Sequence, residues 1–111
     1  MVMEKLSLPL TKVIEVTPNN CLILEDGKKI KLAGIEITAP SKAYQYLREY
    51  VKNKKVFFET EKVVGDVIYG YVFLKNKIFI NKELLRSGAA KLGTGTGHYF
   101  KVLKNFLNNT R

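Results

Sequence analysis

The sequence predicts a mainly β domain of the α+β class, in which five short strands form a small barrel with helices at its side. Runs rich in β-branched and aromatic residues are separated by turn signals, and three other stretches have the apolar spacing of amphipathic helices. With 111 residues, of which 46% are hydrophobic, the chain is long enough for one core. We therefore expect a single domain over residues 1–111.

The predicted strands follow one another with short turns between them. Asp26-Gly27 is a strong type I′ hairpin signal between the second and third strands. In the third strand, the alternation of residues puts Ile30 and Leu32 on one face and Lys29 and Lys31 on the other. The five strands are expected at Thr11–Thr17, Cys21–Glu25, Lys28–Ile35, Lys55–Val63 and Val67–Leu74, with a further short β run at Lys77–Ile80.

Three helices complete the prediction. Pro40 and Ser41 favour a helix start, and the apolar stripe that follows predicts a helix to about Asn53. Asn81 is expected to cap a second helix that ends near Gly88. A third helix is expected from Tyr99 to about Asn108.

This order of elements favours a closed barrel. Closing five short strands largely removes exposed sheet edges, and a helix after the third strand can cover one end of the core. The order is that of an OB-fold, a five-stranded Greek-key barrel, with one helix between strands 3 and 4 and two C-terminal helices. A small α+β sandwich is the alternative.

The charge predicts a polyanionic partner. Lys and Arg total 19 against 10 Asp and Glu, which gives a formal net charge of +9. Because 16 of the 19 cations are Lys, attraction to a phosphate backbone is favoured over base-specific contacts. The chain has no apolar run long enough to span a membrane, no signal-peptide pattern at its start, and a single cysteine, Cys21. We expect a cytoplasmic monomer with no membrane partner.

Two stretches resemble the staphylococcal-nuclease-like, or thermonuclease, family. "KVIEVTPNNCLILEDGKKIKLAGIE" is similar to the first three strands of that family, and "INKELLRSGAAKL" is similar to its N-x-x-L-[VL]-[RK]-x-G-x-A helix. The resemblance covers roughly Lys12 to Leu92 and implies the OB-fold. Nucleases of the family hold calcium with two aspartates, activate water with a glutamate and steady the phosphate with two arginines.

At the matching positions this chain lacks most of those groups. The resemblance aligns Asn20 and Glu36 with the two metal aspartates, Lys31 with the first arginine and Ala39 with the general base. The second arginine falls on Ile68 or on Tyr71, depending on where the alignment is anchored. Losing one electrostatic donor costs about 10²–10³ in rate, and losing a general base costs about 10²–10⁴. We therefore expect no cofactor and no nuclease activity, with Glu36 and Asn20 the only, weak, calcium candidates.

The function expected instead is binding of RNA or single-stranded DNA by a catalytically inactive module. Lys28, Lys29 and Lys31 are the expected phosphate contacts, although they could equally form a solvated strand face. Tyr69 and Tyr71 could stack on bases, but alternating aromatics on a strand are more often core. Two alternatives remain open: a calcium-dependent nuclease with an altered site, and a protein-interaction scaffold using Tyr44, Tyr46 and Tyr50.

Overall fold

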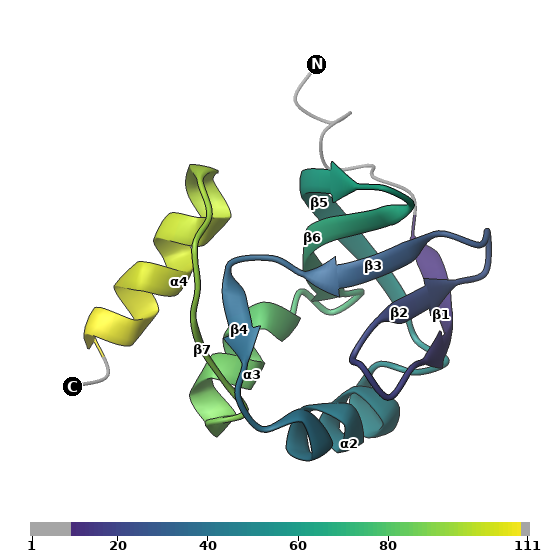
Figure 1. Cartoon of the computed structure of the whole chain (residues 1–111), viewed down its shortest axis with the longest axis horizontal. Helices are drawn as coiled ribbons and strands as arrows, with labels where there is room; N and C mark the ends of the chain where they lie inside the picture. The colour runs from purple at the N-terminus through teal and green to yellow at the C-terminus, as the bar shows by residue number, and fades with distance from the viewer. Residues whose placement is uncertain (1–9, 110–111) are drawn as a thin grey trace.

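The computed structural model describes residues 10–109, which form seven strands in two sheets and three helices (Figure 1). This confirms the α+β class. Residues 1–9 and 110–111 of the expected domain lie outside the described part, and the expectation about a signal peptide falls on these residues. The elements are β1 (Thr11–Val16), β2 (Leu22–Leu24), β3 (Lys29–Leu32), β4 (Ile35–Ile37), α2 (Pro40–Tyr50), β5 (Lys55–Val64), β6 (Val67–Leu74), α3 (Ile80–Ser87), β7 (Ala90–Leu92) and α4 (Gly97–Asn109).

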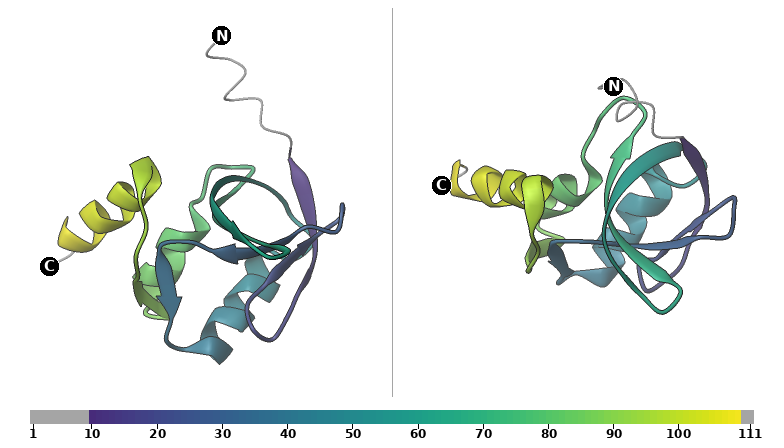
Figure 2. Two further views of the ribbon diagram at one scale, coloured as in Figure 1. Left: turned by 45° about the horizontal axis from the view of Figure 1, so that its top comes forward. Right: turned by 90° about the horizontal axis from the view of Figure 1, so that it is seen from above.

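Five of the strands form a closed ring in the order β1-β2-β3-β6-β5, with β5 pairing back to β1 (Figure 2). All neighbouring pairs in the ring are antiparallel except β3 and β6, which run parallel from Lys29 opposite Val67 to Leu32 opposite Gly70. Strands β5 and β6 form a long hairpin that turns at Gly65 and Asp66. The parallel pairing therefore brings the basic strand β3 beside this hairpin.

The strand expected at Lys28–Ile35 is in fact two strands. Gly34 has a φ of 76°, a left-handed conformation that glycine adopts without a steric penalty, and the chain turns there. Residues after the turn form β4, which leaves the ring and pairs with β7, a strand that the sequence did not predict. A side chain at Gly34 would also meet Leu103 of α4 at 3.0 Å. The turn thus lets α4 approach the ring closely.

Other predicted boundaries also need correction. The expected strand at Lys77–Ile80 is wrong: in this stretch only an isolated bridge joins Phe79 to Phe73, and Lys77 has a left-handed φ of 73°. Helix α2 ends at Tyr50, earlier than the expected end at about Asn53, and the chain turns at Asn53, whose φ is 69°. Helix α4 begins at Gly97, two residues earlier than expected.

Asn81 does not cap α3, because Phe79 occupies the N-cap position and makes no side-chain cap bond. Gly88 does end this helix in the left-handed conformation that was expected of it.

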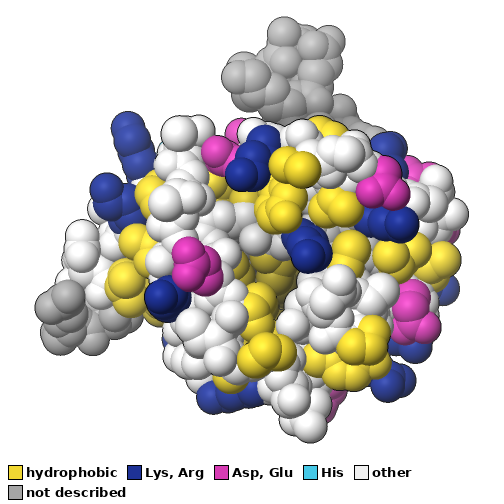
Figure 3. Space-filling model, viewed as in Figure 1, with side chains coloured by type: hydrophobic (Ala, Val, Ile, Leu, Met, Phe, Trp, Pro, Cys, Tyr) yellow, Lys and Arg dark blue, Asp and Glu magenta, His cyan; other side chains and the backbone are white. Residues whose placement is uncertain are grey.

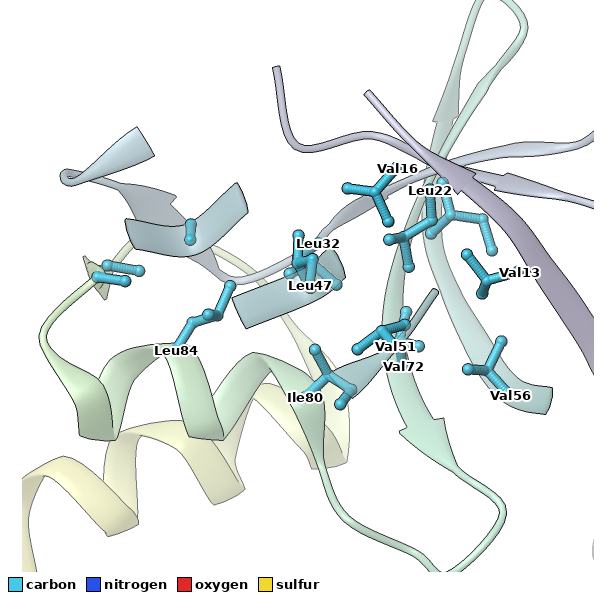
Figure 4. Close-up of a cluster of buried hydrophobic side chains, with 14 of the residues drawn as sticks. Val13, Val16, Leu22, Leu32, Leu47, Val51, Val56, Val72, Ile80 and Leu84 are labelled. Carbon is cyan, nitrogen blue, oxygen red and sulfur yellow. The ribbon is translucent and has the colours of Figure 1, made fainter. Parts of the chain in front are cut away.

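The interior of the ring is aliphatic. Leu47 of α2 and Ile80 and Leu84 of α3 are fully buried against side chains from the strands (Figure 4). Burying one such side chain stabilises a fold by about 1.5–3 kcal/mol. The strand residues that complete this ring core include Val13, Val16, Leu22, Leu24, Ile30, Leu32, Val56 and Val72.

A second cluster lies between the ring and α4. It contains Ala33, Tyr71, Phe79, Leu85 and Leu103, and we call it the α4 cluster. Helix α4 lies outside the ring (Figure 2). No helix within residues 10–109 is long and apolar enough to cross a membrane.

Candidate nucleic-acid interface

One row of side chains crosses three strands on the outer side of the ring. Lys31 of β3 is opposite Tyr69 of β6, and Tyr69 is opposite Lys62 of β5. Directly paired residues on neighbouring strands project from the same side of a sheet. The ammonium group of Lys62 lies 5.2 Å from the centre of the Tyr69 ring. An aromatic ring thus stands between two lysines, and we call this set the Lys31–Tyr69–Lys62 row.

A second row lies two residues along the same strands. Lys29 is opposite Val67, and Val67 is opposite Val64 at the tip of the β5–β6 hairpin. Val64 and its neighbour Val63 are more than half exposed. This part of the surface therefore combines one lysine with apolar side chains.

Two hollows adjoin Tyr69. The first, of about 430 Å³, is lined by Lys31 and Tyr69 together with Asn19, Asn20, Leu32, Ile35, Ile37 and Pro40. The second, of about 400 Å³, shares Leu32, Ile35 and Tyr69 with the first and adds Ala33, Gly34, Glu36, Glu61, Lys62, Thr94, Gly95 and Thr96. Figure 3 shows this face of the molecule hollowed, with yellow apolar side chains inside and blue basic ones at the rim. Such a surface offers apolar contact and positive charge together.

The lysines of this face differ in their partners. Lys28 pairs with Asp26 at 3.1 Å and Lys29 pairs with Asp66 at 3.2 Å. The hydrogen bond and charge of Lys29 lower the pKa of Asp66. Lys31 and Lys62 form no ion pair with any residue of the described part of the chain. Their charge is available to a ligand without first breaking a pair.

Tyr71 cannot serve as a base-stacking residue in this structure, and that prediction is wrong. Its side chain is buried in the α4 cluster, and its hydroxyl donates a hydrogen bond of 2.7 Å to Glu61. Burial and the bond to this carboxylate raise the pKa of Tyr71 well above its ordinary value. Tyr69, two residues earlier, remains half-buried and borders both hollows.

The positions that resemble nuclease groups do not converge. Asn20 lines the first hollow, whereas Glu36 lines the second and lies 3.5 Å from the ammonium of Lys91. Asn20 is buried, and its side-chain oxygen has no hydrogen-bond partner among the described residues. Ala39 precedes α2, where its backbone N–H donates to the carbonyl of Ala89 and its carbonyl accepts the N–H of Ala43, and its methyl group can take no proton. The half-buried Ile68 carries no charge.

Calcium does not fit these residues. The ion takes 6–8 oxygen ligands, mostly from carboxylates and carbonyls. Asn20 offers one neutral oxygen, and Glu36 is the only carboxylate among the matched positions. No group of three or more His, Cys, Asp or Glu side chains within residues 10–109 could hold a metal ion.

The tyrosines expected in a protein-interaction surface lie on α2. The rings of Tyr46 and Tyr50 are 4.9 Å apart, and Tyr50 is half-exposed. The ring of Tyr44 faces the guanidinium of Arg48 at 5.7 Å. They form a small aromatic group, away from the Lys31–Tyr69–Lys62 row.

Sequence reasoning missed Lys62, and it named Glu61 only as a carboxylate, like Glu59, that could replace the lost nuclease groups. Both lie on β5, and their strand position was predictable, but the row depends on the parallel pairing of β3 with β6, for which the sequence carries no local signal. Comparisons of the whole sequence with protein-family models and with curated proteins both returned no match. The Lys31–Tyr69–Lys62 row and its two hollows are thus the best-defined candidate site.

Proposed function

We propose that this chain is an OB-fold module of the staphylococcal-nuclease-like type that binds single-stranded nucleic acid without cleaving it. The closed five-stranded ring and the helix α2 between its third and fourth strands are compatible with this fold. The single observation that carries the proposed function is the Lys31–Tyr69–Lys62 row beside two hollows.

The row suits an unpaired strand better than a duplex. Proteins that bind single strands combine aromatic side chains, on which bases stack, with cations that follow the phosphates. Tyr69 supplies the aromatic surface, and Lys31 and Lys62 supply cations on its two sides. Each ammonium is a point charge rather than a fork, so binding should tolerate many sequences. The same chemistry serves RNA and single-stranded DNA.

The absence of cleavage follows from the side chains themselves. Ala39 cannot act as a base, and neither Ile68 nor Tyr71 offers a guanidinium to a developing negative charge. Asn20 and Glu36 face different hollows. A cytoplasmic location is compatible with the single free cysteine, Cys21, which is buried.

The test is fluorescence anisotropy with a labelled oligonucleotide of about 12 nucleotides, within the usual range of about 4–16 per OB-fold. Tyr69→Ala should weaken binding by about 1–3 kcal/mol, or about 5- to 150-fold in Kd, because the stacking surface is lost. Tyr69→Phe, which keeps the ring, should bind like the parent.

Lys31→Ala combined with Lys62→Ala should weaken binding. The slope of the logarithm of the binding constant against the logarithm of the salt concentration should become shallower by about 0.7 for each lost phosphate contact. The matched control is Lys101→Ala combined with Lys104→Ala on the exposed side of α4, which removes the same charge elsewhere. Equal effects of the two double variants, or binding that ignores salt, would overturn the proposal. Shortened products after incubation with calcium would overturn the non-cleaving part of it.

A further inference from the structure

A third hollow lies at the other end of the β5–β6 hairpin. It has a volume of about 570 Å³, and no acidic residue lines it. We call it the lysine hollow. Its lining residues are Asn53, Lys54, Lys55, Leu74, Lys75 and Asn76.

Backbone hydrogen bonds shape both loops that form the lysine hollow. In the first loop, the N–H of left-handed Asn53 donates to Val13 at 2.7 Å. In the second, the N–H of Lys77 donates to Leu74 at 2.8 Å, and the side-chain oxygen of Asn76 accepts from Ile78 at 3.3 Å. The pairing of Val56 with Leu74 holds the two loops next to each other. Lys54 and Lys75 therefore belong to defined turns, and Lys55 begins β5.

The charges of the lysine hollow are uncompensated. The side chains of Lys54, Lys55 and Lys75 make no ion pair or hydrogen bond with any of residues 10–109. Elsewhere on the surface, by contrast, Lys29 and Lys52 each lie close to a carboxylate. Three lysines line this one hollow, and like charges gathered on one surface repel one another, so an anion bound there would relieve that repulsion. Phosphate, which can accept hydrogen bonds from several ammonium groups, suits this arrangement.

We propose that the lysine hollow binds phosphate groups of the same nucleic-acid strand that contacts the Lys31–Tyr69–Lys62 row. This inference rests on the proposed function and extends it from one contact region to two. Along β5, Lys55 and Lys62 are seven residues apart, which corresponds to roughly 23 Å of strand. A strand must therefore span several nucleotides to reach both regions, and a very short oligonucleotide occupies only one.

The experiment compares oligothymidylates of about 4 and about 16 nucleotides, the limits usual for an OB-fold. Lys54→Glu combined with Lys75→Glu should weaken binding of the longer oligonucleotide at least tenfold. The slope of the logarithm of its binding constant against the logarithm of the salt concentration should become shallower by about 1.4, for two lost phosphate contacts. Binding of the shorter one, which is held at the Tyr69 row, should change less than threefold. Lys101→Glu combined with Lys104→Glu on α4 makes the same change in net charge and is the control.

Equal losses for the two double variants with the longer oligonucleotide would overturn the inference, since only net charge would then matter. A second measurement, made on the parent protein and on the Tyr69→Ala variant, distinguishes failure of the lysine-hollow inference from failure of the proposed function. In both proteins, the backbone N–H signals of Lys75 and Asn76 should shift in nuclear magnetic resonance spectra when the longer oligonucleotide is added. Shifts at these residues with no effect of Tyr69→Ala on affinity would reject the Tyr69 row and keep the lysine hollow, whereas no shift in the parent would reject the hollow.

Discussion

The ring core and the α4 cluster are held together in different ways. The ring core is made of aliphatic side chains that are almost all fully buried, and it joins the strands to α2 and α3. The α4 cluster includes the rings of Tyr71 and Phe79, and the rings that pack against it, such as Phe73, Tyr99 and Phe100, are only partly buried. Burial is complete in the ring core and partial around the α4 cluster. We therefore expect destabilising substitutions in the ring core to unfold the whole domain. Destabilising substitutions in the α4 cluster should cause local unfolding of α4 before the rest of the domain unfolds.

A polar side chain links the parts of each region. In the ring, Asn81 is completely buried, accepts the N–H of Val72 at 2.9 Å and donates to the carbonyls of Ala33 and Gly70 at 2.7 and 3.2 Å. Beside α4, the half-buried carboxylate of Glu61 accepts bonds from the Tyr71 hydroxyl and from the N–H and hydroxyl of Thr96. Asn81 thus ties α3 to β6 and to the turn that follows β3, and Glu61 ties the segment before α4 to the hairpin.

The largest effect is expected from Leu47→Ala. This side chain is fully buried where α2 packs into the ring core, and deleting it leaves a cavity. The free energy of unfolding should fall by about 2–5 kcal/mol. Val63→Ala at the exposed hairpin tip is the control and should change it by less than about 0.5 kcal/mol. Urea denaturation measures both, and a small loss for Leu47→Ala would show that the ring core is not tightly packed.

Asn81→Ala is expected to cost about 3 kcal/mol, because each buried polar group left without a partner costs about 1–3 kcal/mol. The N–H of Val72 and the carbonyl of Ala33 would lose their side-chain partner, while the carbonyl of Gly70 would keep the N–H of Ala33. Asn76→Ala removes an exposed asparagine and should cost well under 1 kcal/mol. Denaturation gives the free energies, and hydrogen exchange at Val72 should quicken only in the first variant. An equal loss of unfolding free energy in the two variants would mean that the buried hydrogen bonds of Asn81 do not stabilise the fold.

The smallest effect concerns Glu61 and pH. The Tyr71 hydroxyl, followed by the Thr96 N–H and hydroxyl, lowers the pKa of Glu61 below its ordinary value of about 4.3. A carboxyl group whose pKa is lower in the folded state stabilises the fold above its unfolded pKa, and this contribution is lost as pH falls through the folded pKa. Acid should therefore weaken the attachment of the segment before α4. The N–H signal of Thr96 should report this change in nuclear magnetic resonance spectra.

Glu61→Gln should remove this part of the pH dependence, because the amide does not ionise. Glu59→Gln, an exposed change two residues away on the same strand, should leave the pH dependence of the Thr96 signal intact. If Glu61→Gln behaves like the Glu59 control, the carboxylate of Glu61 does not hold this segment.

Much of the fold was predictable because local patterns determine it. Alternation correctly placed Ile30 and Leu32 in the core, and the β2–β3 hairpin turns at Asp26-Gly27 as expected. The expected turn type I′ is wrong, because Gly27 has a positive φ and Asp26 does not. Strand β6 has the predicted bounds, and Gly88 ends α3 as expected. The prediction was wrong where a single residue turns the chain, as at Gly34 and Lys77, because a left-handed residue inside an apolar run leaves the hydrophobic pattern unchanged.

The sequence by itself determined the excess of positive charge, the α+β class and the lysines of β3, because composition and alternation are local properties of the chain. Only the tertiary structure decided which aromatic side chain could meet a ligand. Tyr69 and Tyr71 project from the same side of β6, and their sequence context is nearly the same. Helix α4 and the segment around Thr96 cover Tyr71, whereas the parallel pairing with β3 leaves Tyr69 between Lys31 and Lys62. These contacts join residues far apart in the chain, so no local pattern could indicate them.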